Sequence, residues 1–159
     1  MPEIDARGLL KHPVRLVAIG FGSGLVPRAP GTAGTLAAIP VVLLAATLPL
    51  WGYLILITGF FILGVWVCHE TTRYLGVHDH PVIVWDEVVG YMIGMIGSPI
   101  TWPTIVVGFV LFRAFDILKP WPIGWLDRHA TGGFGVMIDD VMAGLYTVAV
   151  LHLAFALGW

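Results

Sequence analysis

Charged residues are spaced along the chain so that long stretches contain none of them. The longest of these stretches covers positions 29–69, between Arg28 and Glu70. It can hold two membrane-spanning helices of about 18 residues each and a tight turn. Pro49-Leu50-Trp51-Gly52 is the natural place for that turn, because proline and glycine interrupt regular helix.

A second uncharged stretch runs from Val88 to Phe112 and is divided by turn residues at 97–103. A polar segment at 121–137 then separates it from a last apolar stretch that ends near the C-terminus. The pattern therefore predicts an all-α integral membrane protein, a bundle of about five short spans at 34–48, 51–69, 82–96, 104–119 and 138–157.

The region before the first span is expected to lie at the membrane surface. Residues 1–15 form a polar, basic tail, and the apolar stretch at 16–25 is too short to cross a bilayer. Residues 26–35 contain two prolines and two glycines, which predicts an irregular loop leading into a helix N-terminus. Thr32 or Thr35 is the expected helix cap, so 16–33 forms an interfacial segment with a candidate phosphate loop.

Composition supports a membrane protein and a single domain, 1–159. The chain is 58% hydrophobic and 11% charged, with a mean hydropathy of +0.90, whereas about 25% of residues in soluble domains are charged. A net charge of -2 argues against a nucleic-acid partner. With the basic N-terminus in the cytoplasm, alternation of five spans places every Asp, Glu, Lys and Arg on the cytoplasmic side or at its membrane boundary.

Tryptophans fit the same multi-pass orientation. Aromatic residues with a polar edge gather at both membrane interfaces. The topology predicts an outer belt and an inner belt, made respectively of Trp51, Trp102 and Trp159 and of Trp85, Trp121 and Trp125.

Five carboxylates are expected to meet at the cytoplasmic mouth of the bundle: Asp86 and Glu87, Asp116, and Asp139 with Asp140. Ionised groups this close in a poorly solvated place must bind protons or a metal ion. Oxygen ligands favour a hard cation, Mg²⁺ before Ca²⁺, and Cys68 is the single cysteine. The expected metal ligands are Asp86, Glu87, Asp139 and Asp140, and the catalytic candidates are Asp86, Asp116 and Asp140.

Glycines follow two of these acids by one helical turn. Gly90 lies four residues after Asp86, and Gly144 lies four residues after Asp140. Small residues at this spacing allow two helices to approach closely. Ordinary helix packing and assembly of an ion site explain the spacing about equally well.

Several residues are candidates for binding phosphate. Arg113, Asp116 and Lys119 recur every three residues, so Asp116 is expected within reach of both cations, in either an ion-pair ladder or an acid flanked by phosphate-binding cations. Arg28, Thr32 and Thr35 would add a guanidinium, hydroxyls and backbone amides. His80 is a further phosphate candidate, although for His78 and His80 a hydrogen-bonding role is favoured over metal ligation. Asp79 is expected to be a solvated loop acid.

Most other phosphatase chemistries do not fit the chain. A cysteine phosphatase needs five residues between its cysteine and arginine, but Cys68 and Arg73 are separated by only four. Metal-assisted hydrolysis remains, with one carboxylate accepting a proton from water. A phospho-aspartate intermediate is the open alternative.

Four motifs carry a family resemblance. They are Gly20-Phe21-Gly22-Ser23-Gly24-Leu25 with Pro30-Gly31-Thr32 and Gly34-Thr35; His78-Asp79-His80 with Val84-Trp85-Asp86-Glu87; Arg113-Ala114-Phe115-Asp116 with Lys119-Pro120-Trp121-Pro122; and Gly132-Gly133 with Met137-Ile138-Asp139-Asp140 and Ala143-Gly144. In this order they resemble the bacterial phosphatidylglycerophosphatase A family over roughly Leu16 to Leu157. The resemblance implies a Mg²⁺-dependent phosphatase of the bacterial inner membrane that hydrolyses phosphatidylglycerophosphate to phosphatidylglycerol, using acids for metal and water and Arg and Lys for phosphate. A cation transporter and a non-enzymatic membrane subunit remain as alternatives.

Overall fold

A computed structural model describes residues 6–78 and 80–159, and these residues form helices and no strands. The expected all-α class is therefore confirmed for the described part of the chain. Asp79 lies outside the described residues, as do residues 1–5 of the N-terminal tail. The elements are α1 (Ala6–Lys11), α2 (Pro13–Ala18), the 3₁₀ helix η1 (Gly20–Leu25), α3 (Pro30–Ala45), α4 (Leu50–Leu75), α5 (Trp85–Gly94), α6 (Trp102–Leu118), α7 (Ile123–His129) and α8 (Gly132–Ala156).

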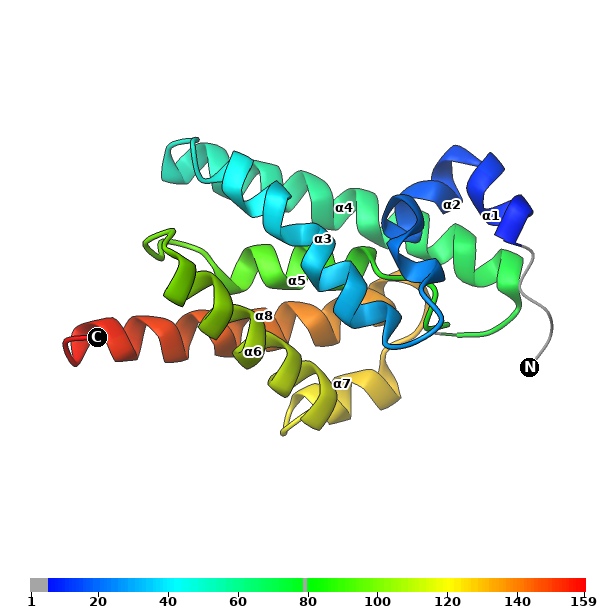
Figure 1. Ribbon diagram of the computed structural model, residues 1–159. Coiled ribbons are helices and arrows are strands. Elements are labelled where there is room, and N and C mark those ends of the chain that lie inside the picture. Colours follow the sequence, from blue (N-terminus) through cyan, green and yellow to red (C-terminus); the bar gives the residue numbers. More distant parts are fainter. Residues whose placement is uncertain (1–5, 79) are drawn as a thin grey trace.

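The five helices that the hydrophobic pattern predicted run side by side through the molecule (Figure 1). The α3–α4 turn, the α5–α6 loop and the C-terminus lie at one end. Helices α1, α2 and α7 lie at the opposite end. The first of these ends, residues 46–50, 95–102 and 157–159, contains no Asp, Glu, Lys or Arg. Successive helices of the bundle thus alternate in direction, and one end of the described bundle is uncharged. The sides of a membrane on which the two ends lie stay a prediction.

Two of the described helices, α4 and α8, are long and apolar enough to cross a membrane. Helix α5 has only 10 residues, which gives a length of about 15 Å against a hydrocarbon layer of about 30 Å. It cannot cross a bilayer alone, so the expected count of five spans stays a prediction. Nearly every residue of α5 is buried, because the helix lies between α4 and α8 and also contacts α3 and α6.

Glycines bring the backbones of α5 and α8 together. A Cβ atom added at Gly90 would lie 2.7 Å from the carbonyl oxygen of Asp140, and one at Gly144 would overlap the carbonyl of Gly90. One turn further along α5, a Cβ at Gly94 would lie 2.9 Å from the Thr147 side chain. The predicted close approach at these glycines is confirmed.

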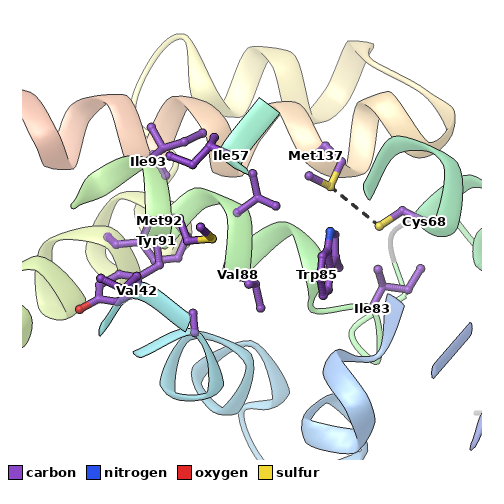
Figure 2. Close-up of a cluster of buried hydrophobic side chains, with 14 of the residues drawn as sticks. Val42, Ile57, Cys68, Ile83, Trp85, Val88, Tyr91, Met92, Ile93 and Met137 are labelled. Carbon is purple, nitrogen blue, oxygen red and sulfur yellow. Dashed lines mark hydrogen bonds between the residues drawn. The ribbon is translucent and has the colours of Figure 1, made fainter. Parts of the chain in front are cut away.

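The hydrophobic core surrounds α5, as Figure 2 shows. Val88 and Met92 of this helix are buried, with Val42 of α3 and Ile57 of α4 in the same cluster. The buried hydroxyl of Tyr91 in this core is hydrogen-bonded, since it donates to the Ile105 carbonyl at 2.9 Å. The core therefore fixes the position of α5, whose first turn carries two of the acids.

Trp85 does not belong to an interfacial belt. Only 6% of it is exposed, and its indole N–H donates to the carbonyl of Phe60 at 3.0 Å across the interface with α4. Its position at the start of the buried helix α5 explains the difference. The other predicted belt residues are exposed: Trp51, Trp102, Trp121, Trp125 and Trp159.

The start of α3 differs from the expected loop. The helix begins at Pro30, because proline suits the first turn, where a backbone N–H is not needed. Ala29, at φ 50°, occupies the cap position without a side-chain hydrogen bond. Neither Thr32 nor Thr35 is a helix cap, and the Thr35 hydroxyl instead donates to the Gly31 carbonyl at 2.9 Å.

Candidate active site

One cavity of about 280 Å³ contains all five acids that the sequence predicted to converge. It lies where the beginning of α3, the loop before α5, and helices α5, α6 and α8 meet. The residues that line it are Ala29, Pro30, Gly31, Pro81, Ile83, Asp86, Glu87, Arg113, Asp116, Lys119, Asp139 and Asp140. The expected meeting of acids from three helices is therefore found.

Helices α5 and α8 place four of these acids. Asp86 and Glu87 lie in the first turn of α5, where the positive end of the helix dipole favours negative charge. Asp139 and Asp140 lie about two turns inside α8, which is why they reach the same depth as the start of the shorter helix. Asp86, Asp139 and Asp140 are respectively 7%, 6% and 2% exposed, so little solvent screens their charges.

Arg113 of α6 contacts two of the acids. Its guanidinium donates to Asp116, one turn further along the same helix, and lies 3.8 Å from the Glu87 carboxylate. The distance to Glu87 exceeds a hydrogen bond, so Asp116 is the acid that Arg113 binds. The expected contact between Arg113 and Asp116 is confirmed.

Lys119 binds acids other than Asp116. Its ammonium donates to Asp127 of α7 and to Asp139 of α8, each at 2.6 Å. The prediction that Lys119 contacts Asp116 one helical turn away is wrong, because α6 ends at Leu118 and Lys119 adopts φ 44°. Burial lowers the pKa of Lys119, but the hydrogen bonds and charges of the two carboxylates raise it more, so the pKa lies above its ordinary value. The residue stays protonated at neutral pH.

Some buried carboxylate oxygens of the cavity have no hydrogen-bond donor within the described residues. Glu87 Oε2 and Asp140 Oδ2 are buried and accept no hydrogen bond from the described part of the chain. Asp86, Glu87 and Asp140 offer oxygens within 4.8 Å of one another, and so do Asp116, Asp139 and Asp140. Asp140 belongs to both groups. Oxygens arranged in this way fit a hard divalent cation.

Gly31 closes the cavity on the side of α3. A Cβ atom there would overlap the Glu87 carboxylate and lie 3.0 Å from the Arg113 guanidinium. Only a residue without a side chain allows the α3 backbone to approach the side chains of Glu87 and Arg113 this closely. The loop predicted to bind phosphate thus reaches the acids through its backbone.

Four of the predicted phosphate-binding residues do not line the cavity: Arg28, Thr32, Thr35 and His80. Arg28 is exposed, Thr32 is half-buried, and the buried Thr35 is hydrogen-bonded within its own helix. His80 Nδ1 accepts a hydrogen bond from the Val82 N–H at 3.2 Å, which agrees with the hydrogen-bonding role favoured for this loop. Phosphate binding by these four residues stays a prediction.

Asp127 is a residue of the site that sequence reasoning missed. It lies eight positions after Lys119. Side chains within one helix contact each other at spacings of three or four residues, so helical periodicity does not predict this contact. The chain must reverse between α6 and α7 before the two side chains can meet. The available signal was the single acidic residue of α7, whose sequence is Ile-Gly-Trp-Leu-Asp-Arg-His.

The chain was compared with known proteins. Residues 16–155 match the family model described as Phosphatidylglycerophosphatase A. A protein of that name from Escherichia coli (strain K12) is 46% identical over 144 residues, covering 90% of this chain and 84% of that protein. Another of that name, from Haemophilus influenzae, is 49% identical over 144 residues, covering 89% of this chain and 88% of that protein.

A more distant relative has a different name. It comes from Bacteroides thetaiotaomicron, is named provisionally as a phosphatidylinositol-3-phosphatase, and is 37% identical over 148 residues, covering 87% of this chain and 91% of that protein. No solved structure matches the chain. From the family match and the two relatives that share its name, the chain belongs to the phosphatidylglycerophosphatase A family.

Proposed function

We propose that the protein is a lipid phosphomonoester phosphatase that hydrolyses phosphatidylglycerophosphate to phosphatidylglycerol and phosphate. Membership of the phosphatidylglycerophosphatase A family supports the substrate. The observation that carries the proposal is the cavity itself, where five carboxylates lie beside Arg113 and Lys119. Phosphate transfer depends mainly on positioning and on compensating charge, and these side chains can supply both.

The acids suit Mg²⁺, which the enzyme would bind through the expected ligands Asp86, Glu87, Asp139 and Asp140. The donor set is all oxygen, and Glu87 Oε2 and Asp140 Oδ2 accept no hydrogen bond within the described residues. Bound Mg²⁺ would neutralise phosphate oxygens and lower the pKa of a coordinated water.

The chain's own residues would orient the substrate and move a proton. Arg113 offers a fork of N–H donors for the phosphate oxygens, and Lys119 adds a second positive charge in the same cavity. Asp86, Asp116 or Asp140 would accept the proton of the water that attacks phosphorus. As the bond between phosphorus and the lipid oxygen breaks, the same carboxyl would return the proton to that oxygen, which leaves as the hydroxyl of phosphatidylglycerol. Direct attack by one of these carboxylates remains the alternative.

A membrane location follows from the same substrate, and the exposed surface supports it. Many large apolar side chains are exposed, including Ile55 and Ile62 of α4 and Val110 of α6. Soluble monomers rarely expose so much contiguous apolar surface. We place the protein in the bacterial cytoplasmic membrane as a multi-pass protein, with its N-terminus and the cavity toward the cytoplasm.

The two alternative functions have less support. A cation transporter needs ionisable residues through the depth of the membrane. Among the described residues, however, the end of the bundle opposite α7 has no Asp, Glu, Lys or Arg, and His152 there has its Nε2 2.9 Å from the Ile96 carbonyl. A non-enzymatic subunit has no need of unsatisfied buried carboxylate oxygens, which are costly to retain.

The test is phosphate release by the detergent-solubilised full chain with and without Mg²⁺. Phosphatidylglycerophosphate, its deacylated analogue and phosphatidylinositol 3-phosphate would be compared, the last because of the name of the Bacteroides relative. We expect Mg²⁺-dependent release that is fastest with phosphatidylglycerophosphate. Absence of release from every lipid would refute the proposed function, and faster release from the inositol lipid would refute the proposed substrate.

A further inference from the structure

Two of the five acids that line the cavity accept hydrogen bonds from its two cations. We infer that Asp86, Glu87 and Asp140 form the divalent-cation subsite, whereas Asp116 and Asp139 are positioning residues that hold Arg113 and Lys119 for the phosphate. This inference rests on the proposed function and assigns separate roles within its site. It moves Asp139 from the expected metal ligands to the phosphate side of the cavity, and it leaves Asp86 and Asp140 as the candidate proton acceptors.

The cation subsite contains the carboxylate oxygens that lack a hydrogen-bond donor. Asp140 is 2% exposed, and its Oδ2 accepts no hydrogen bond from the described residues. The same holds for Oε2 of Glu87, whose nearest cation is Arg113 at 3.8 Å. Both side chains line the cavity, and with Asp86 they present oxygens within 4.8 Å of one another. A buried carboxylate without a donor is stabilised by a bound cation.

The other two acids already have cationic partners. Asp116 accepts from Arg113, and Asp139 Oδ2 accepts from Lys119 at 2.6 Å. These partners cancel most of the charge that would attract a second divalent ion. The two acids also hold the side chains of Arg113 and Lys119 in place. These long side chains therefore lose less conformational entropy when phosphate binds.

The two subsites adjoin, because Asp140 lies within 4.8 Å of both sets. A phosphate held by Arg113 and Lys119 would therefore sit beside the ion held by Asp86, Glu87 and Asp140. Charge favours this division as well: two cations face five acids in the cavity, and the close hydrogen bonds of these cations within it go to Asp116 and Asp139.

The inference predicts that ion binding and substrate binding respond to different substitutions. Mn²⁺, used in place of Mg²⁺, would be titrated by electron paramagnetic resonance into the detergent-solubilised full chain without substrate. We compare Asp86→Asn with Asp139→Asn, and the control is Glu70→Gln, which alters an exposed acid on α4. The Km for phosphatidylglycerophosphate would be measured at saturating Mg²⁺.

We expect Asp86→Asn to weaken Mn²⁺ binding by at least about 30-fold, because a ligand and its charge are lost. Asp139→Asn should weaken Mn²⁺ binding by less than about fivefold, because Lys119 already compensates the charge of Asp139. The same substitution should raise the Km for phosphatidylglycerophosphate. Glu87→Gln is a second ligand variant should Asp86→Asn not fold. Equal loss of Mn²⁺ binding in Asp139→Asn and Asp86→Asn would overturn the division. Wild-type protein that binds no Mn²⁺ yet releases phosphate would overturn the ion subsite and leave the phosphatase.

Discussion

Asp140 is the acid on which both carboxylate groups of the cavity depend. Replacement by asparagine keeps its shape and removes its charge, so we expect phosphate release to fall by about 10² to 10⁴-fold. The fold should survive, because removal of an uncompensated buried charge does not destabilise it. Phosphate release and a thermal melt in detergent check both parts. Loss of folding instead of activity would favour the structural subunit.

A substitution at Gly31 tests the close approach of α3 to Glu87 and Arg113. In Gly31→Ala the new methyl group would displace the Glu87 carboxylate and crowd Arg113. A displacement of about 1 Å costs about 100-fold in rate where geometry matters, and we expect a loss of that order. Gly52→Ala is the matched control, since its Cβ would meet atoms no closer than 3.4 Å. Equal activity of the two variants would contradict the role of Gly31.

Lys119 provides a test that depends on pH. Its raised pKa means that its contribution to stability is complete below the ordinary lysine pKa and is lost as pH rises through the folded value. We therefore expect Lys119→Met to lower the melting temperature by the same amount from about pH 6 to about pH 9. Asp127→Asn, which leaves Asp139 as a partner, should lower it less. A difference between wild type and Lys119→Met that disappears within this range would contradict the pairing.

At the scale of residues, the sequence predicted which acids meet but not how they are paired. An ionised acid next to a long apolar run must lie at the boundary of the apolar layer, because charge is costly inside it. The sequence could therefore predict that five acids lie close together: Asp86, Glu87, Asp116, Asp139 and Asp140. The partner of Lys119 could not be predicted, because it depends on the chain reversal between α6 and α7.

At the scale of elements, the crossing of α5 and α8 is the contact that brings Asp86 near Asp140. Gly90→Leu would force the two backbones apart, because even a Cβ would lie 2.7 Å from the Asp140 carbonyl. Overpacking of this kind costs about 1 to 3 kcal/mol or more, so we expect a lower melting temperature together with lost activity. Gly59→Ala, where a Cβ meets nothing within 4 Å, is the control. An unchanged melting temperature in Gly90→Leu would contradict the tight crossing.

Helix identity was more predictable than helix length. All five apolar stretches became helices, because an uncharged run of that length has no other way to satisfy its backbone in a membrane. The third helix is shorter than expected, since residues 82–84 are buried in an extended or irregular loop whose Val84 N–H donates to the Ala18 carbonyl at 2.9 Å. That contact with α2 is tertiary and leaves no periodic signal in the sequence.

At the scale of the whole molecule, the apolar surface is distributed as a lipid-facing surface would be. In the apolar 18-residue segment of α4, only 22% is buried inside the protein, whereas 50% of the corresponding segment of α8 is buried. Helix α4 therefore lies at the periphery with its apolar side chains outward, and α8 lies closer to the centre, where its acids reach the cavity. The 26 residues of α4 span about 39 Å, enough for a hydrocarbon layer of about 30 Å.

The proposed topology predicts that the two ends of α4 lie on opposite sides of the membrane. Single cysteines would be placed at Thr47 and at Val77, which flank the helix and are exposed, after Cys68→Ala removes the buried thiol. In intact spheroplasts an impermeant maleimide should label the cysteine at 47 and not the one at 77. Membrane disruption should make both reactive. The C-terminal end of α4 and the first turn of α5, whose acids line the cavity, lie toward the same end of the bundle. Labelling of position 77 from outside would therefore contradict the proposed cytoplasmic orientation of the cavity.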